Sequence, residues 1–310
     1  MKDEGEKIRL VIILGPTASG KTELAVRLAE HFGGEIVNAD SLQIYRGMDI
    51  GTAKPAPELR RRVPHHLIDR VDPDWDFSAS DFRREAGRAI ADIHGRGKKV
   101  FLVGGTGLYI KALLKGLADT PSGGGAIRTE LEETARANGA AELLRRLAEV
   151  DPETAGRLHP NDRVRIIRAL EVYLQTGRPI SQFRSEHGFA GDYYDHLKIG
   201  IAVERSELYR RIDERVERMI EEGLVGEVEG LLSAGFDHRL KSLRSIGYKE
   251  ICAHLRGECP LYEAVQLIKR DSRRYAKRQL TWLRRDDEII WVEYPEEFDT
   301  ICNHVIEFLA

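Results

Sequence analysis

The feature that most constrains this chain is a glycine-rich loop that directly follows a short apolar run. Residues 15–22 read Gly-Pro-Thr-Ala-Ser-Gly-Lys-Thr, after the β-branched run at 10–14 and before a stretch of helical spacing at 23–30. A strand, this loop and a helix in that order are typical of a phosphate-binding loop, in which backbone amides and the helix N-terminus face an anion. A glycine-rich turn without a ligand is the alternative, and this context disfavours it. We therefore expect the chain to bind a di- or triphosphate.

The residue types in the loop suggest roles for individual positions. Lys21 is placed to neutralise terminal phosphates, and the hydroxyl groups of Thr22 and Ser19 are candidate ligands of Mg²⁺. The predicted phosphate-binding set is Gly15, Pro16, Thr17, Ala18, Ser19, Gly20, Lys21 and Thr22. The loop alone identifies neither the polyphosphate nor the reaction.

Length and composition narrow the class of protein. With 310 residues, of which 42% are hydrophobic and 32% charged, the chain matches a globular protein of one large domain or two smaller ones. No stretch approaches the roughly 18 apolar residues of a membrane span, and the charged N-terminus lacks the apolar segment of a signal peptide. Three cysteines without a C-x-x-C pair favour a reducing, cytoplasmic location. Nothing in the sequence requires more than a monomer.

Strand and helix signals alternate in the first part of the chain. The pattern predicts strands at 10–14, 35–38 and 100–103, and helices at 21–32, 79–95 and 107–115. This alternation is typical of a parallel sheet with helices on both faces. Ligands of such sheets lie beyond the carboxyl ends of the strands, where the phosphate loop is found.

The middle of the chain reads as a helical insertion. A turn-rich segment at 119–125 precedes helical stretches at 126–138, 140–149, 151–158 and 161–176. A strand at 197–203, a long charged helical region at 206–234, a helix at 259–285 and a strand at 288–292 follow. We predict an α/β fold: a phosphate-loop parallel sheet flanked by helices, built from residues 1–117 and 197–310, with a mostly helical insertion domain at 118–196.

Two polar residues follow predicted strands at the edge where the phosphate loop lies. Asp40 is placed for proton abstraction or Mg²⁺ ligation, although a turn-capping role fits its position as well. The strand at 100–103 ends in Gly-Gly-Thr-Gly and not in the metal-binding aspartate of an ordinary phosphate-loop hydrolase, which argues against hydrolysis. Within that segment Thr106 offers a hydroxyl group to a ligand or, alternatively, to the N-terminus of the next helix.

The predicted helix at 267–285 carries an unusual excess of positive charge. Between Lys269 and Arg285 stand eight basic residues and one acid, Asp271, which leaves little ion pairing within the helix. One face, with Arg274, Lys277 and the neighbouring Arg278, is therefore expected to bind phosphates of a nucleic acid. A solvated charged face is the alternative.

Several longer segments extend these observations into a family resemblance. The chain resembles the tRNA dimethylallyltransferases, the bacterial tRNA adenosine isopentenyltransferases, from about residue 10 to residue 285. The matching segments are residues 15–22, Asp-Ser-Leu-Gln-Ile-Tyr-Arg-Gly-Met-Asp-Ile-Gly-Thr-Ala-Lys-Pro at 40–55, Pro-His-His-Leu-Ile-Asp at 64–69, Gly-Gly-Thr-Gly-Leu-Tyr at 104–109, Arg-Ala-Leu-Glu-Val at 168–172, Ile-Gly-Tyr-Lys-Glu at 246–250 and Ala-Lys-Arg-Gln-Leu-Thr-Trp at 276–282. The segment at 40–55 is the most specific.

The resemblance implies transfer of a dimethylallyl group from dimethylallyl diphosphate to N6 of adenosine 37 in the anticodon stem-loop of tRNA, giving N6-(dimethylallyl)adenosine and diphosphate. Asp40 matches the general base, and the phosphate loop with Lys21 and Mg²⁺ matches the site that holds the diphosphate. Arg211 and Arg215 match arginines near that diphosphate. Thr106 matches a donor-side residue that also approaches the tRNA.

The tRNA contacts that the resemblance implies lie in three parts of the chain. They are Asp40, Ser41, Leu42 and Gln43 beside the predicted sheet, Thr106, and, in the insertion, Arg128, Val164, Arg165, Ile166, Ile167 and Arg168. Two segments depart from the family pattern. Val164 stands where the family often has glutamine, and Ser-Gly-Gly-Gly at 122–125 replaces an acidic, proline-containing segment.

Three other functions are consistent with parts of the pattern. A small-molecule kinase would use the loop for ATP but leaves the basic helix unexplained. A non-catalytic RNA-binding protein gives Asp40 no role. An adenylate isopentenyltransferase, which prenylates free nucleotides, gives no role to the tRNA-contact positions of the insertion.

Overall fold

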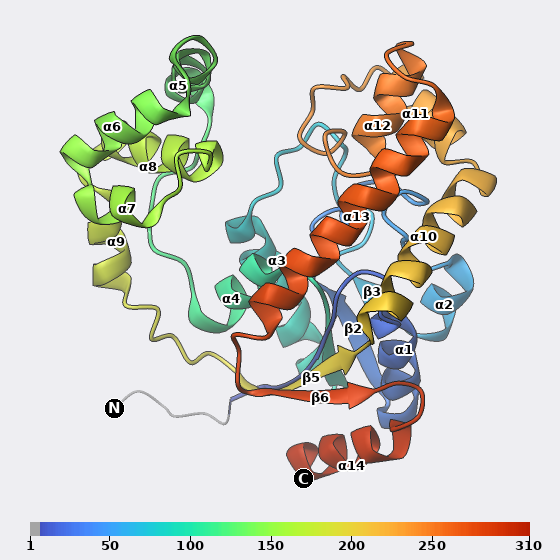
Figure 1. Ribbon diagram of the computed structural model, residues 1–310. Helices are drawn as coiled ribbons and strands as arrows, with labels where there is room; N and C mark the ends of the chain where they lie inside the picture. Colours follow the sequence, from blue (N-terminus) through green and yellow to red (C-terminus); the bar gives the residue numbers. More distant parts are fainter. Residues whose placement is uncertain (1–6) are drawn as a thin grey trace. The chain divides into compact units, whose positions relative to one another are not determined.

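The computed structural model describes residues 7–310, and it divides into two compact units (Figure 1). The first takes in the chain up to Leu114 together with Asp192–Ala310, and the second is Lys115–Gly191. Within the described residues, no helix has the length and apolar character that crossing a bilayer requires.

The first unit is built on a six-stranded sheet in which every pairing is parallel. The strands are β1 (Arg9–Leu14), β2 (Gly34–Asn38), β3 (His65–His66), β4 (Lys99–Gly104), β5 (Asp195–Ala202) and β6 (Ile289–Glu293), in the order β3-β2-β4-β1-β5-β6. β1 lies between β4 and β5, with Ile12 opposite Leu102 and Lys198. The predicted α/β fold with a parallel sheet is confirmed.

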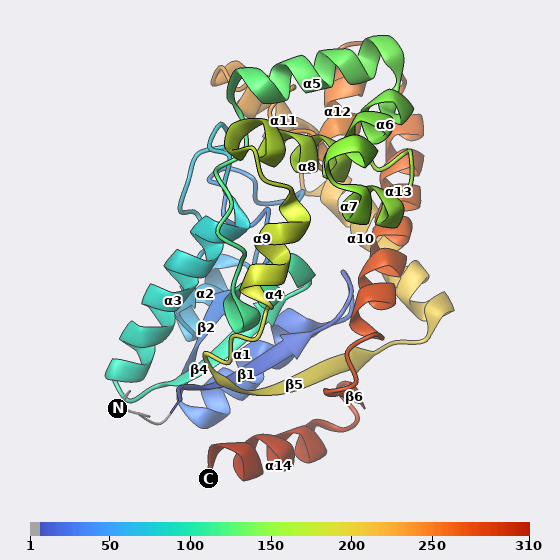
Figure 2. The same ribbon diagram turned by 90° about the vertical axis from the view of Figure 1, so that its left-hand side faces the viewer.

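Helices cover both faces of this sheet. They are α1 (Lys21–Phe32), α2 (Pro57–Arg62), α3 (Ala79–Gly95), α4 (Gly107–Lys115), α10 (Arg205–Glu221), α11 (Leu224–Ser233), α12 (Tyr248–Leu255), α13 (Leu261–Leu283) and α14 (Phe298–Leu309). Side chains of β1 alternate between the faces, as the pleat requires. Leu10 and Ile12 pack with α3, α4 and α11–α13, whereas Val11 and Ile13 pack with α1 and α14. Both views show α10 and α13 running side by side (Figures 1 and 2).

The predicted helices are present, among them the short α4 at 107–115, but three short elements of this unit were not predicted. The helical region expected at 206–234 consists of two helices, because Gly223 takes a left-handed φ of 102° between α10 and α11. The sequence analysis missed α2, β3 and α12. These are short elements of two to eight residues, too short to show a clear period.

The second unit is helical throughout its regular structure. It consists of α5 (Gly125–Asn138), α6 (Ala140–Val150), α7 (Pro152–Arg157), α8 (Arg163–Thr176) and α9 (Ile180–His187). A small core that includes Leu143, Leu147 and Ile166 holds these helices together. The sequence analysis missed α9, a short helix that begins directly after Pro179.

Two features of the first unit shape its carboxyl edge, where ligands of a parallel sheet bind. The loop between β1 and α1 uses left-handed φ angles at Ala18 (64°) and Gly20 (93°), so its amides turn away from helical pairing. β4 ends at Gly104 against the backbone of Ala39, which follows β2. A Cβ atom at residue 104 would overlap the Ala39 carbonyl group. Glycine there lets the two strand ends approach.

We predict that Gly104→Ala destabilises the protein because backbone atoms of Ala39 cannot move aside as a flexible side chain would. Overpacking of this kind costs about 1–3 kcal/mol, measurable as a lower midpoint of urea unfolding. Gly230→Ala in α11 is the matched control, since a Cβ there meets no atom within 4 Å. In an exposed helix this change is expected to stabilise by roughly 0.5–1 kcal/mol. Equal midpoints for both variants would refute the close approach.

Candidate active site

A cavity of about 340 Å³ opens at the carboxyl edge of the sheet in the first unit. Its wall is formed by the phosphate loop, the ends of β2 and β4, the segment 40–53, and the helices α10 and α13. The sequence-predicted residues that line it are Thr17, Lys21, Thr22, Asp40, Ser41, Leu42, Gln43 and Arg215. The loop and the Asp40 segment, which the sequence analysis selected separately, therefore meet in one cavity.

The ammonium group of Lys21 is hydrogen-bonded within the phosphate loop and can still bind an anion. Its Nζ donates to the carbonyl oxygen of Pro16 at 3.1 Å. Burial lowers the pKa of Lys21 to about 8; the Asp40 charge opposes this shift, and the Arg215 charge adds to it. A bound anion would restore the full positive charge.

Arg215 reaches the loop from α10. Its Nη1 donates to the hydroxyl oxygen of Thr17 at 2.8 Å, and burial lowers its pKa from the ordinary value. Neither Lys21 nor Arg215 forms an ion pair with a carboxylate of residues 7–310, so both cations remain available to an anion in the cavity. Arg211, one turn earlier, instead donates from Nε to Glu207 at 2.6 Å.

Asp40 lies opposite the two cations, at the start of a turn. One carboxylate oxygen accepts the backbone N–H of Leu42 at 2.9 Å, which leaves the other oxygen without a bond to residues 7–310. The next residue, Ser41, donates its N–H to the Thr106 hydroxyl oxygen at 3.2 Å. Thr106 thus supports the turn that carries Asp40. Turn capping and a catalytic role are compatible in this geometry.

Tyr275 of α13 completes the polar wall beside Asp40. Its side chain lies near Thr106, and burial, followed by the Asp40 charge, raises its pKa to about 12. The phenol is therefore neutral at physiological pH.

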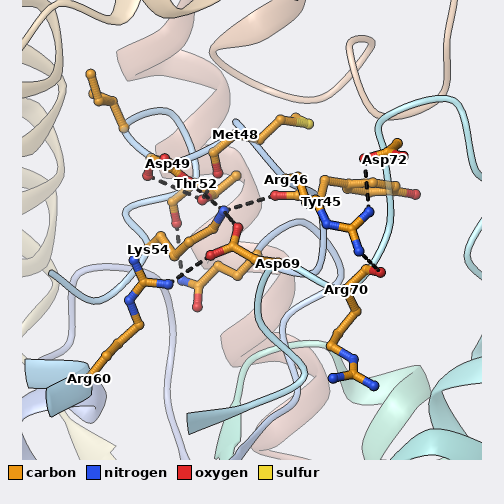
Figure 3. A network of polar contacts seen from close by, with 12 residues as sticks. Tyr45, Arg46, Met48, Asp49, Thr52, Lys54, Arg60, Asp69, Arg70 and Asp72 are labelled. Carbon is orange, nitrogen blue, oxygen red and sulfur yellow. Dashed lines mark hydrogen bonds and ion pairs between the residues drawn. The ribbon is translucent and has the colours of Figure 1, made fainter. Parts of the chain in front are cut away.

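The cavity wall at 51–53 is held by a buried polar network (Figure 3). Gln43 donates from its amide nitrogen to the carbonyl oxygens of Thr52 and Ala53, both at 3.2 Å. Lys54, whose side chain is 2% exposed, donates to Asp49, Asp69 and the carbonyl oxygen of Tyr45. Although burial alone would raise it, hydrogen bonds from Lys54 and Arg60 hold the pKa of Asp69 below its usual value. The Gln43 amide nitrogen therefore already donates to two carbonyl oxygens of the protein.

Glu227 of α11 holds the same wall from the other side, and sequence analysis missed it. Its carboxylate accepts the backbone N–H groups of Asp49 (2.8 Å), Ile50 (2.7 Å) and Gly51 (3.2 Å), and the hydroxyl group of Tyr248 at 2.6 Å. Backbone N–H groups of this turn and a carboxylate from a helix far along the chain therefore satisfy each other's hydrogen bonding. No local pattern around Glu227 indicates this partner.

The apolar part of the cavity wall is made of Val103, Ile212, Val216, Met219, Ile246 and Ile268. A ligand that fits here combines an anionic group at the phosphate loop with a small hydrocarbon group or a base against this wall.

The oxygen groups at the loop suit a magnesium ion bound together with a phosphate. Mg²⁺ prefers hard oxygen ligands and usually takes only one or two from the protein. Thr22 and Asp40 offer such oxygens to the cavity. The Ser19 hydroxyl group is buried without a hydrogen-bond partner among the described residues and packs close to Gly15. Residues 7–310 contain no cluster of three His, Cys, Asp or Glu side chains that would hold a metal alone.

Of the eight basic residues from Lys269 to Arg285, four are paired. The partners are acids of α10 and one acid of α13 itself: Lys269 with Glu217, Arg273 with Asp213, and Arg270 and Arg274 with Asp271. Within residues 7–310 no ion pair forms at Lys277, Arg278, Arg284 or Arg285. The count of charges within the helix therefore overstated its free positive charge, because α10 supplies acids that are distant in sequence.

The predicted contact residues of the second unit divide by burial. Val164 is 68% exposed and Arg165 lies beside it on the surface of α8, paired with Asp162. Ile166 and Ile167 are 0% and 2% exposed and pack in the core of the unit. Their side chains are unavailable to a partner because helical periodicity turns these two positions inward.

Arg128 and Arg168 share one buried carboxylate. Glu171 is fully buried and accepts from Arg168 at 2.8 Å, lies 3.5 Å from an Arg128 nitrogen, and accepts the Gly124 N–H at 2.6 Å. The glycine segment at 122–125, which departs from the family pattern, is thereby tied to α8.

Known proteins match this chain over nearly its whole length. A family profile described as IPP transferase matches residues 43–286. A protein of Geotalea uraniireducens named tRNA dimethylallyltransferase 2 is 74% identical over 310 residues, 100% of both chains. A tRNA dimethylallyltransferase of Geobacter sulfurreducens is 64% identical over 99% of this chain and 98% of the relative.

Solved structures agree with these matches. The full-length tRNA isopentenylpyrophosphate transferase of Bacillus halodurans is 42% identical with a TM-score of 0.72, over 98% of this chain and 97% of the other. A eukaryotic dimethylallyltransferase described as acting on tRNA is 29% identical with a TM-score of 0.79, over 96% of this chain and 77% of the other.

We predict that the anion affinity of the cavity falls as pH rises through about 8. The unliganded Lys21 loses its proton there, whereas the terminal phosphate of a diphosphate ester ionises near pH 6 and stays charged. Calorimetric titration with methyl diphosphate from pH 6.5 to 9.5 measures this. Lys21→Arg keeps its charge over the whole range and is expected to flatten the profile. Parallel profiles for the two proteins would contradict the assignment.

Proposed function

Since this chain belongs to the IPP transferase family, we propose that it transfers a dimethylallyl group from dimethylallyl diphosphate to N6 of adenosine 37 in the anticodon stem-loop of tRNA. The enzyme class predicted from the sequence, tRNA dimethylallyltransferase, is confirmed. The observation that best supports the detailed reaction is the cavity itself. It sets Asp40 opposite Lys21 and Arg215 and adds an apolar wall.

In the proposed reaction, the diphosphate group of dimethylallyl diphosphate binds to the phosphate loop. The loop amides from Gly15 to Thr22, with Lys21 and Arg215, bind the oxygens that gain negative charge as the carbon–oxygen bond breaks. Arg211 supports α10 near this site through its pair with Glu207. When bound, Mg²⁺ would be held by Thr22 and Ser19 with the phosphates, and it would supply further charge neutralisation. The apolar wall receives the dimethylallyl group.

In the proposed reaction, Asp40 accepts the proton that N6 of adenosine loses. The N6 nitrogen of adenosine forms a bond to C1 of the dimethylallyl group, the C1–oxygen bond breaks, and diphosphate leaves with the bonding electrons. The N6 proton passes to the Asp40 carboxylate oxygen that the Leu42 N–H does not occupy. Thr106 holds this turn in place, and Ser41, Leu42 and Gln43 form the wall against which the base lies.

The target base must leave its stack to enter a cavity of this kind. Extrusion costs least in a single-stranded loop, which fits an anticodon loop as the substrate. We assign the backbone contacts to Arg274, Lys277 and Arg278 on α13, and to Arg128, Val164, Arg165 and Arg168 in the second unit. Ile166 and Ile167 support α8 from within its core instead of touching RNA.

The reaction is tested with radiolabelled dimethylallyl diphosphate, Mg²⁺ and one of three acceptors: unmodified tRNA, free adenine nucleotide, or no acceptor with labelled ATP. Label in tRNA at adenosine 37 is the expected result. Label in free nucleotide would identify an adenylate isopentenyltransferase, and phosphoryl transfer from ATP would identify a kinase. Either outcome overturns the proposal.

Asp40→Asn is expected to lower kcat by about 10²–10⁴-fold, the usual contribution of a positioned general base. The amide oxygen still accepts the Leu42 N–H, so the turn is kept while the proton acceptor is lost. Donor and tRNA affinities should stay within about twofold. Asp72→Asn, an exposed carboxylate paired with Arg46, is the matched control and should leave kcat unchanged. A wild-type kcat in the Asp40 variant would exclude it as the base.

Replacing Lys277 and Arg278 by glutamine should weaken tRNA binding and reduce its salt dependence. Each lost phosphate contact lowers the slope of log K against log salt concentration by roughly 0.7–0.9. Filter-binding titrations at several salt concentrations measure this, with methyl diphosphate affinity as the internal control. Arg239→Gln, at a cation paired with Asp237, should leave the slope unchanged. An unaltered slope in the double variant would mean that this face of α13 is only solvated.

A further inference from the structure

The basic helix α13 also builds the interior of the active site, through a glutamine on its buried side. Gln279 is 8% exposed and lines the cavity. We propose that Gln279 is a positioning residue, an inference that rests on the proposed function. It fixes the phosphate loop and the loop at Gly105 relative to each other, so that the donor carbon lies close to the Asp40 turn.

Both ends of the Gln279 amide are used. Its Oε1 accepts the backbone N–H of Thr17 at 2.9 Å, and its Nε2 donates to the carbonyl oxygen of Gly105 at 3.1 Å. The two loops are 88 residues apart in sequence and follow different strands, β1 and β4. A single side chain that accepts from one and donates to the other fixes their relative position.

Each of these contacts leads to a group with a role in the reaction. Thr17 is also the residue that Arg215 binds, on the diphosphate side. Gly105 precedes Thr106, whose hydroxyl oxygen accepts the N–H of Ser41, next to Asp40. Gln279 therefore stands midway in a series of hydrogen bonds and peptide bonds that connects Arg215 to Asp40.

The loop and the helix pack closely around this contact. A Cβ atom at Gly105 would overlap the Gln279 Nε2 atom, and one at Gly107 would lie 2.6 Å from the Trp282 ring. Tyr275 lies near Thr106. Gln279 and Trp282, one turn apart on α13, therefore pack against the segment from Gly105 to Gly107. The exposed Lys277 and Arg278 lie on the same rigid helix.

The chemistry explains why the position needs an amide. Methionine has a similar length but offers neither a strong acceptor nor a donor. Residue 279 would then form no hydrogen bond to either loop. Glutamate keeps the acceptor for Thr17, but its ionised form cannot donate to Gly105 and faces that carbonyl oxygen with negative charge. Protonated glutamate again has one donor and one acceptor.

The first test is Gln279→Met. Misplacement of reacting groups by about 1 Å costs on the order of 100-fold in rate, so kcat for dimethylallyl transfer should fall by roughly that factor. The affinity for tRNA should stay within about twofold, because the exposed face of α13 is unchanged. Gln266→Met, at an exposed position of the same helix, is the matched control and should not alter kcat. An unchanged kcat in the Gln279 variant would overturn the proposal.

The second test separates positioning from a general loss of stability. In Gln279→Glu, protonation of the new carboxyl group restores the donor to Gly105, so the ratio of variant to wild-type kcat/KM should rise at least tenfold as pH falls from 8.5 to 5.5. The ratio removes the pH effects that the two proteins have in common. A ratio that does not change with pH would contradict the two-sided role of the amide.

The two proposals fail in different ways. If the wild-type protein transfers no label to tRNA, the proposed function is wrong. If the wild type transfers label but the Gln279 variants match it, only the positioning role is wrong.

Discussion

The site depends on keeping two half-buried cations and one half-buried carboxylate in one cavity without letting them pair. A buried cation is costly unless it is hydrogen-bonded or paired. Here Lys21 binds the Pro16 carbonyl oxygen, Arg215 binds the Thr17 hydroxyl group, and Asp40 accepts the Leu42 N–H. Each charge is stabilised by a neutral group. Because no ion pair consumes them, both cations stay available to a diphosphate and the carboxylate to a proton.

This arrangement rests on helices that reach the sheet edge from far along the chain. α10 contributes Arg215, α11 contributes Glu227, and α13 contributes Tyr275 and Gln279. The phosphate loop supplies amides, but its geometry relative to the Asp40 turn is set by these later helices. The helix that carries the exposed bases Lys277 and Arg278 is thus also part of the reaction site.

The sequence predicted the parts of the site that local patterns encode. The phosphate loop has a fixed spacing between a strand and a helix, and Asp40 follows a buried strand, so both could be selected from the sequence, and residues of both line the cavity. Glu227 and Gln279 act on backbone groups more than 170 residues away, and nothing near them in sequence marks those partners. The free charge of α13 was overestimated for the same reason, since Asp213 and Glu217 lie on another helix. Gly223 divides the helical region predicted at 206–234 into two helices. The sequence did not predict this division, because a single glycine can stand inside a helix or end one.

The proposed diphosphate site depends above all on Lys21, whose pKa burial lowers to about 8 in the unliganded cavity. Proton uptake on binding tests this most directly, by calorimetric titration of a non-transferable thiolo analogue of dimethylallyl diphosphate in buffers of different ionisation enthalpy. With a free pKa of about 8, Lys21 should take up about half a proton at pH 8 and almost none at pH 6.5. Lys21→Arg should show no uptake at either pH. Equal uptake by the wild type at both pH values, or none at pH 8, would contradict the account.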